Sequence, residues 1–277
     1  MEIWYRLVEH LLPFGWVQYD FMKNALLAVI LVAPIFGLTG TMVVNNRMAF
    51  FSDAIGHAAL TGIALGVLLN LADPLWAMII FAVILAVLMV MARLRTEASP
   101  DTTIGVFFAT AVALGIVILS RGGGFNKYSR YLIGDLLSVT PTDIAMLLGV
   151  CIIVLLFWVF FYNRLFLTSF NPSVAASRGI RVVQVEIVFA VMIALVVTVS
   201  IQWVGLLIIN SLLILPAAAA RNITRSMKAY NAAGVLISLL SGITGLILSY
   251  AWGTATGATI VLVTFAIYAA TAWMRVR

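Results

Sequence analysis

Long apolar runs, separated by short polar or charged connections, make up almost the whole chain. A membrane-spanning helix needs about 20 mostly apolar residues, and nine segments approach or reach that length. They are 21–43, 50–70, 75–93, 102–120, 142–163, 182–201, 204–220, 228–251 and 256–275. The segment 204–220 is short and contains Pro216, which favours a kinked or re-entrant helix. The pattern therefore predicts an all-α, polytopic membrane helical bundle with eight or nine transmembrane helices.

The first 20 residues follow a different pattern. Apolar side chains recur there at helical spacing among charged ones, which is typical of an amphipathic helix at a membrane surface. The apolar positions are Trp4, Leu7, Val8, Leu11 and Leu12. No basic stretch precedes an apolar core, as it would in a cleaved signal peptide. We expect an amphipathic N-terminal interfacial segment over 1–20, with His10 at its surface, and a transmembrane domain over 21–277.

The composition supports a membrane protein and argues against a nucleic-acid partner. The chain is 64% hydrophobic and only 9% charged, whereas about 25% of a soluble domain is charged. Its net charge is +6, but membrane proteins collect Lys and Arg in their cytoplasmic connections. With nine spans and the 164–181 connection in the cytoplasm, 11 of the 16 Lys and Arg residues lie on the cytoplasmic side.

Several kinds of chemistry are excluded by missing motifs. A Walker A loop needs Gly-Lys followed by Ser or Thr, and none of Lys23, Lys127 and Lys228 follows a glycine. The chain also lacks the H-E-x-x-H and G-x-S-x-G motifs of metallo- and serine hydrolases. Cys151 is the single cysteine, so no intrachain disulfide forms, and it is interpreted as a small buried apolar residue. We therefore expect no enzyme activity and no permanently bound cofactor.

Asp53 and His57 are the strongest candidates for a functional site. They lie four residues apart in an apolar segment, so a helix places them on one face, one turn apart. Burying a carboxylate in a membrane is costly, and such a residue is by default a candidate for an ion pathway. Zinc, manganese and ferrous iron all accept carboxylate and imidazole ligands. A twofold dimer would bring together two Asp and two His; alternatively, Asp53 lies near a membrane surface and His57 is hydrogen-bonded within the bundle.

Other polar residues in the spans have two interpretations. Asn210 and Gln202 are possible pathway-lining residues, although hydrogen bonding between helices is the more frequent role of such side chains. Asp101 follows Pro100, which suits the N-terminal turn of a helix. After Phe170, Asn-Pro initiates a turn and 173–178 has room for a short helix before Gly179 ends it.

Taken together, these residues resemble the permease subunit of metal-ion ABC transporters, the ABC-3 family, over nearly the whole chain from residue 21. Six motifs in this order make the resemblance specific. They are 48–58 (MAFFSDAIGHA), 101–108 (DTTIGVFF), 134–139 (GDLLSV), 170–180 (FNPSVAASRGI), 204–207 (VGLL) with 215–221 (LPAAAAR), and 249–250 (SY) with 257–259 (GAT). The chain departs from the family pattern at Gly56, Leu60-Thr61-Gly62, Pro100 and Asn171, so the resemblance does not identify the metal.

The resemblance implies a permease of an ATP-driven importer for zinc, manganese or iron, in a prokaryotic plasma (inner) membrane. Its partners would be cytoplasmic ATP-binding subunits, an extracytoplasmic metal-binding protein, and a second permease in a homodimer or paired heterodimer. Asp53 and His57 would hold the transported divalent ion. The cytoplasmic coupling loop 164–181 would dock on the ATPase through Ser173, Val174, Ala175, Ala176, Ser177, Arg178 and Gly179.

An ion-coupled secondary metal transporter is the alternative. It would use the same Asp–His pair without ATP. Secondary carriers often have inverted repeats and acidic residues in broken helices. This chain has few intramembrane acids and no visible repeat, which favours the ABC interpretation.

Overall fold

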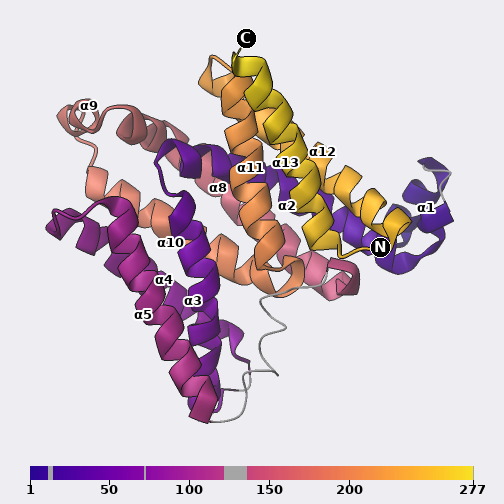
Figure 1. Ribbon diagram of the computed structural model, residues 1–277, viewed down its shortest axis with the longest axis horizontal. Coiled ribbons are helices and arrows are strands. Elements are labelled where there is room, and N and C mark those ends of the chain that lie inside the picture. The colour runs from indigo at the N-terminus through magenta and orange to yellow at the C-terminus, as the bar shows by residue number, and fades with distance from the viewer. Residues whose placement is uncertain (12–14, 72, 122–135, 277) are drawn as a thin grey trace. The chain divides into compact units, whose positions relative to one another are not determined.

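A computed structural model of the chain describes residues 1–11, 15–71, 73–121 and 136–276, and the regular structure in these ranges is helical (Figure 1). The motif at 134–139 therefore lies partly outside the described residues. In chain order the helices are α1 (Glu2–Leu11), η1 (Gly15–Gln18), α2 (Asp20–Asn45), α3 (Ala49–Leu68), α4 (Leu75–Arg95), α5 (Pro100–Arg121), η2 (Leu136–Ser138), α8 (Pro141–Phe170), α9 (Pro172–Ser177), α10 (Val182–Val204), α11 (Leu206–Ile223), α12 (Met227–Trp252) and α13 (Thr256–Val276).

The predicted spans correspond one to one to helices. In the described part of the chain, eight helices are long and apolar enough to cross a membrane, namely α2, α3, α4, α5, α8, α10, α12 and α13. The remaining predicted segment, 204–220, forms α11, which is shorter and contains Pro216. The prediction of an all-α membrane bundle with eight or nine spans is confirmed.

One helix extends beyond its predicted end. α8 continues to Phe170, although the span was predicted to stop at residue 163. The sequence after 163 remains largely apolar and contains no helix breaker before Asn171-Pro172, so the helix has no reason to end earlier. The connection to α10 therefore starts at Asn171, and the first residues of the predicted 164–181 loop are helical.

The chain divides into two compact units, which are described separately. The first comprises Met1–Val44, Asp135–Ile153 and Trp203–Arg277. In it, α11, α12 and α13 pack against one another. A Cβ at Gly37 would lie 2.6 Å from the carbonyl oxygen of Gly234, so α2 and α12 touch backbone to backbone. Close approach of this kind lets van der Waals packing hold membrane helices together.

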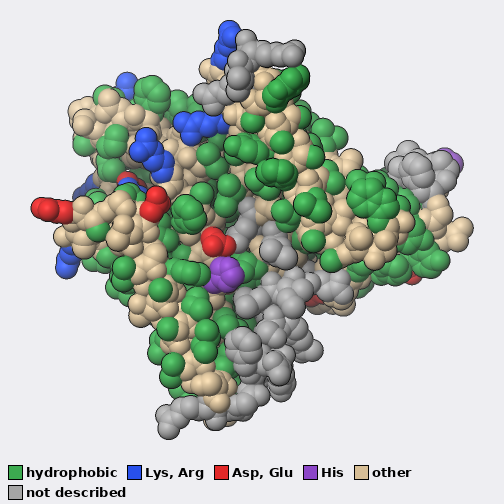
Figure 2. Space-filling model, viewed as in Figure 1, with side chains coloured by type: hydrophobic (Ala, Val, Ile, Leu, Met, Phe, Trp, Pro, Cys, Tyr) green, Lys and Arg blue, Asp and Glu red, His purple; other side chains and the backbone are tan. Residues whose placement is uncertain are grey.

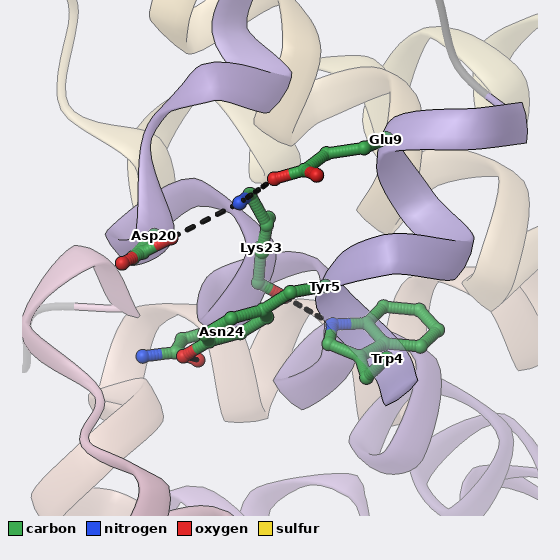
Figure 3. A network of polar contacts seen from close by, with 6 residues as sticks. All are labelled: Trp4, Tyr5, Glu9, Asp20, Lys23 and Asn24. Carbon is green, nitrogen blue, oxygen red and sulfur yellow. Dashed lines mark hydrogen bonds and ion pairs between the residues drawn. The ribbon is translucent and has the colours of Figure 1, made fainter. Parts of the chain in front are cut away.

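A polar network joins α1 to the start of α2 within this unit (Figure 3). The Lys23 side chain is only 3% exposed, and its Nζ donates to Glu9 at 2.6 Å and to Asp20 at 3.0 Å. Tyr5 places its ring 4.8 Å from the same Nζ and donates its hydroxyl to Asn24. The predicted N-terminal helix is confirmed, while its location at a membrane surface stays a prediction.

Replacing Glu9 by Gln should loosen α1. The Lys23 ammonium would keep Asp20 but lose its shorter ion pair, and a buried charge with fewer partners is costly. Because the Glu9 side chain is half exposed, we expect a local cost of only about 1 kcal/mol. Amide hydrogen exchange over residues 2–11 should become about fivefold faster, whereas the control Glu2→Gln, on the exposed first turn, should leave it unchanged. Equal exchange in both variants would show that the ion pair does not hold α1.

The second unit comprises Asn45–Gly134 and Val154–Gln202. α3 packs against α4 and α5. A Cβ at Gly62 would lie 2.5 Å from the Met78 backbone, so α3 and α4 are in close contact. Arg93 on α4 pairs with Glu186 on α10 at 3.3 Å. This packing fixes α3 and α5 side by side, and it positions the candidate site.

Candidate functional site

Asp53 and His57 lie on one side of α3, one turn apart, as their spacing predicted. The distance from Asp53 Oδ1 to His57 Nε2 is 3.6 Å, which suits an ion pair and exceeds a good hydrogen bond. The two side chains are 39% and 40% exposed. All the remaining residues from 51 to 64 are buried, so Asp53 and His57 form the one accessible strip of this part of the helix. Figure 2 shows an acidic and a histidine side chain together among hydrophobic ones on the face in view.

The imidazole of His57 is positioned by α5. Its ring meets Phe108 edge to face, with centroids 5.5 Å apart and planes at 76°. Such a contact restrains the ring without using either nitrogen. The edge-to-face contact and the 3.6 Å approach of Nε2 to Asp53 Oδ1 together orient the imidazole.

A hollow of about 350 Å³ lies beside Asp53, between the first turns of α3 and α5. Two carboxylates line it, those of Asp53 and Asp101, among otherwise apolar walls. The remaining lining residues are Phe50, Ala54, Ile104, Gly105 and Phe108. The hollow therefore brings carboxylates from two adjacent helices of the same unit to one opening, while His57 lies one turn from Asp53 and is not among the lining residues.

The sequence placed Asp101 in the first turn of α5, and this is confirmed. At the same helix start, the Oγ of Ser99 accepts from the backbone N–H of Thr102 at 3.1 Å. The shared hollow was missed. Counting alternate sides from one span to the next places the starts of α3 and α5 on the same side of the membrane, but it does not predict that the two helices pack together.

One copy of the chain provides an incomplete metal site. Among the residues that the structure describes, no group of three or more His, Cys, Asp or Glu side chains converges to hold a metal ion. A divalent ion at Asp53 and His57 would therefore take its remaining ligands from water or from a second chain. An open arrangement of this kind suits transient rather than permanent binding.

Comparison with known proteins identifies the family. The model of the ABC 3 transport family matches residues 18–275. The chain belongs to this family. It is 35% identical over 247 residues to the high-affinity zinc uptake system membrane protein ZnuB of Haemophilus influenzae, covering 88% of this chain and 94% of that protein. It is 32% identical over 255 residues to the manganese transport system membrane protein MntC of Halalkalibacterium halodurans, covering 91% and 87%.

A solved structure shows the same architecture. PsaBC from Streptococcus pneumoniae in complex with Fab superposes with a TM-score of 0.80 at 29% identity, and the match covers 93% of this chain and 92% of that one. The agreement extends over nearly the whole length of both chains. This ABC 3 protein is therefore a membrane transport subunit with the helical permease fold, and it is not itself a catalyst.

The short helix α9 of this ABC 3 protein forms where the sequence predicted it. Asn171 caps it by accepting from the backbone N–H of Val174 at 3.1 Å, and Gly179 ends the segment at a φ of +75°. Ala175 is fully buried. The side chains of Ser173, Val174, Ala176, Ser177 and Arg178 are exposed. A short, capped helix with an exposed face is thus available between α8 and α10.

The two amide residues of the prediction are placed only by their backbone. Gln202 belongs to the last turn of α10, and Asn210 belongs to the first half of α11. The structure does not describe the side chains of these two residues. Pathway lining by Gln202 and Asn210 stays a prediction.

Proposed function

We propose that this chain is the permease subunit of an ATP-driven ABC importer for a divalent transition-metal ion, whether zinc, manganese or iron. The observation that carries the proposal is the Asp53–His57 pair, half exposed on an otherwise buried stretch of α3. The zinc and manganese uptake systems named among the relatives support the class of ion. The ion is the cargo of the protein, and no cofactor is permanently bound.

The chemistry of the pair suits a passing ion. Carboxylate oxygen and imidazole nitrogen bind zinc, manganese and ferrous iron, and both are supplied from a single helix turn. Two copies of the chain, or paired related permeases, around a twofold axis would supply four ligands. Neither permease copy alone binds the ion tightly, so the ion is released when the two copies move apart.

Asp101 extends this pathway by one step. Because Arg93 and Arg95 end α4 on the basic, cytoplasmic side, the first turn of α5 and its acid lie on that side too. An ion that leaves Asp53 through the shared hollow meets the Asp101 carboxylate next. The Asp101 carboxylate lowers the free-energy barrier for the ion to leave, and it does not complete a tight binding site.

Asp101→Asn should reduce uptake of zinc or manganese about fivefold, because it removes one charge from the hollow and keeps the shape of the side chain. Radiometal uptake in cells that depend on this transporter measures the effect. Glu97→Gln is the matched control, since Glu97 is an exposed acid just before α5 that does not line the hollow. An Asp101→Asn variant that transports as well as the control would remove Asp101 from the pathway.

ATP hydrolysis belongs to separate cytoplasmic subunits in this scheme, because the chain has no Walker A loop. An extracytoplasmic metal-binding protein delivers the ion, and the complex resides in a prokaryotic plasma (inner) membrane. The exposed face of α9, from Ser173 to Gly179, docks on the ATP-binding subunit. Because α9 is joined to α8 and α10 by only a few residues on either side, a force on α9 would be passed to both helices.

Val174→Asp tests the docking role. Val174 is 39% exposed on α9, and a charge there would be buried without a partner if the face is covered. We expect co-purification of the ATP-binding subunit to fall at least tenfold while the permease stays at normal membrane levels. Val183→Asp is the control, because Val183 is equally exposed but lies in the first turn of α10, where a carboxylate is favourable. Undiminished co-purification with Val174→Asp would exclude α9 as the docking element.

A further inference from the structure

A second hollow, of about 480 Å³, lies where the end of α8, the end of α9 and the start of α10 meet. Each of these segments contributes one arginine to it, namely Arg164, Arg178 and Arg181. No acidic residue is among the lining residues. The ion pathway proposed above does not use this hollow, although Arg178 and Gly179 in its lining also end the proposed docking segment. All of its walls belong to the second unit.

The three guanidinium groups are not paired with an acid in the described part of the chain, since no carboxylate there lies within ion-pair distance of any of them. The nearest acid along α10 is Glu186, and it pairs with Arg93 on α4. Three cations around one hollow repel one another, and an anion between them would relieve that repulsion. Arginine forks match the oxygens of a phosphate especially well.

The rest of the lining indicates where the anion comes from. Phe161, Val185 and Val188 form an apolar wall, and they belong to α8 and α10, which are long enough to cross the membrane. The Arg164 guanidinium lies 5.9 Å from the Phe161 ring, at the junction of the basic and apolar parts. A protein carboxylate would use only the arginines, whereas a phospholipid would use both parts. Basic pockets between membrane helices on the cytoplasmic side suit lipid headgroups.

We propose that this hollow binds the phosphate headgroup of an anionic phospholipid from the cytoplasmic leaflet. The phosphate lies between Arg164, Arg178 and Arg181, and the part of an acyl chain next to the headgroup lies along Phe161 and Val188. Gly179 and Ile180 complete the wall. A bound lipid therefore braces the residues that join α9 to α10, and it links lipid composition to the position of the docking helix.

Native mass spectrometry of the full-length chain in detergent, titrated with phosphatidylglycerol, tests this site. We expect the double variant Arg164→Gln/Arg181→Gln to need about tenfold more phosphatidylglycerol for half-occupancy than the unmodified chain. Arg95→Gln, which removes an exposed arginine that does not line the hollow, should bind as the unmodified chain does. Phosphatidylcholine should bind weakly to all three. As a check independent of the variants, phosphatidylglycerol binding to the unmodified chain should weaken as salt rises.

Three results would overturn the proposal. The first is a double variant that binds phosphatidylglycerol no more weakly than the unmodified chain, or no more weakly than Arg95→Gln. The second is displacement of the lipid by millimolar inorganic phosphate, which would show a site for a free anion. The third is a double variant that keeps the lipid but loses the ATP-binding subunit, which would assign the arginines to an acidic protein surface. Each can occur whether or not Asp53 and His57 carry a metal ion.

Discussion

Asp53→Asn and His57→Gln should each reduce metal uptake about 100-fold relative to the unmodified permease. Either change removes one of the two ligands that the proposed site takes from α3, and losing even an orienting partner of a ligand costs about 10–100-fold. Asparagine and glutamine keep much of the size and polarity of the original side chains, so the packing of α3 should survive. Zinc- or manganese-dependent growth and radiometal uptake measure the effect.

Two matched controls separate the site from a general loss of charge. Glu97→Gln removes an acid from the exposed α4–α5 connection, and His10→Gln removes the only other histidine, which is exposed on α1. Both should transport normally at equal membrane levels. Uptake at the unmodified rate by Asp53→Asn or by His57→Gln would show that the pair is not part of the pathway.

Among the described glycines, Gly40 should be the one at which an added methyl group damages the fold most. A Cβ at Gly40 would fall on the carbonyl oxygen of Leu213, so α2 and α11 must separate to accept it. Overpacking between side chains typically costs about 1–3 kcal/mol, and here the obstacle is backbone, which does not rotate away. We expect a loss of more than about 3 kcal/mol in the free energy of unfolding, together with low membrane levels.

Gly149→Ala is the control for this prediction. Gly149 lies in α8, and nothing is within 4 Å of the position of its Cβ. Replacing a helical glycine there should be neutral or slightly stabilising, since alanine is the better helix former. Thermal unfolding of the two purified variants in the same detergent compares them. A melting temperature for Gly40→Ala that matches Gly149→Ala would contradict the close contact of α2 and α11.

The sequence was sufficient for those features that depend on local pattern. Apolar runs predicted every span, and helical periodicity placed Asp53 beside His57, because both follow from the geometry of a single helix. The capped helix α9 was also predicted, since Asn-Pro before it and Gly179 after it act within a few residues.

Features that depend on contacts between helices were not predicted. Asp101 shares a hollow with Asp53 only because α5 packs on α3, and no spacing along the chain states that. The backbone contacts at Gly37 and Gly40 involve single glycines paired with distant segments, so they leave no repeating signal. The three arginines of the second hollow are separated by up to 17 residues and converge only where the last part of α8 and the start of α10 meet around it.

Transport by the reconstituted complex tests the central claim most directly. Proteoliposomes would contain this permease with its ATP-binding subunit, and they would be supplied with the metal-loaded binding protein outside. The account predicts zinc or manganese accumulation only when ATP is present on the side of the ATP-binding subunit, and none with Asp53→Asn although ATP is still hydrolysed. Accumulation by the permease alone without ATP, or undiminished accumulation with Asp53→Asn, would contradict it.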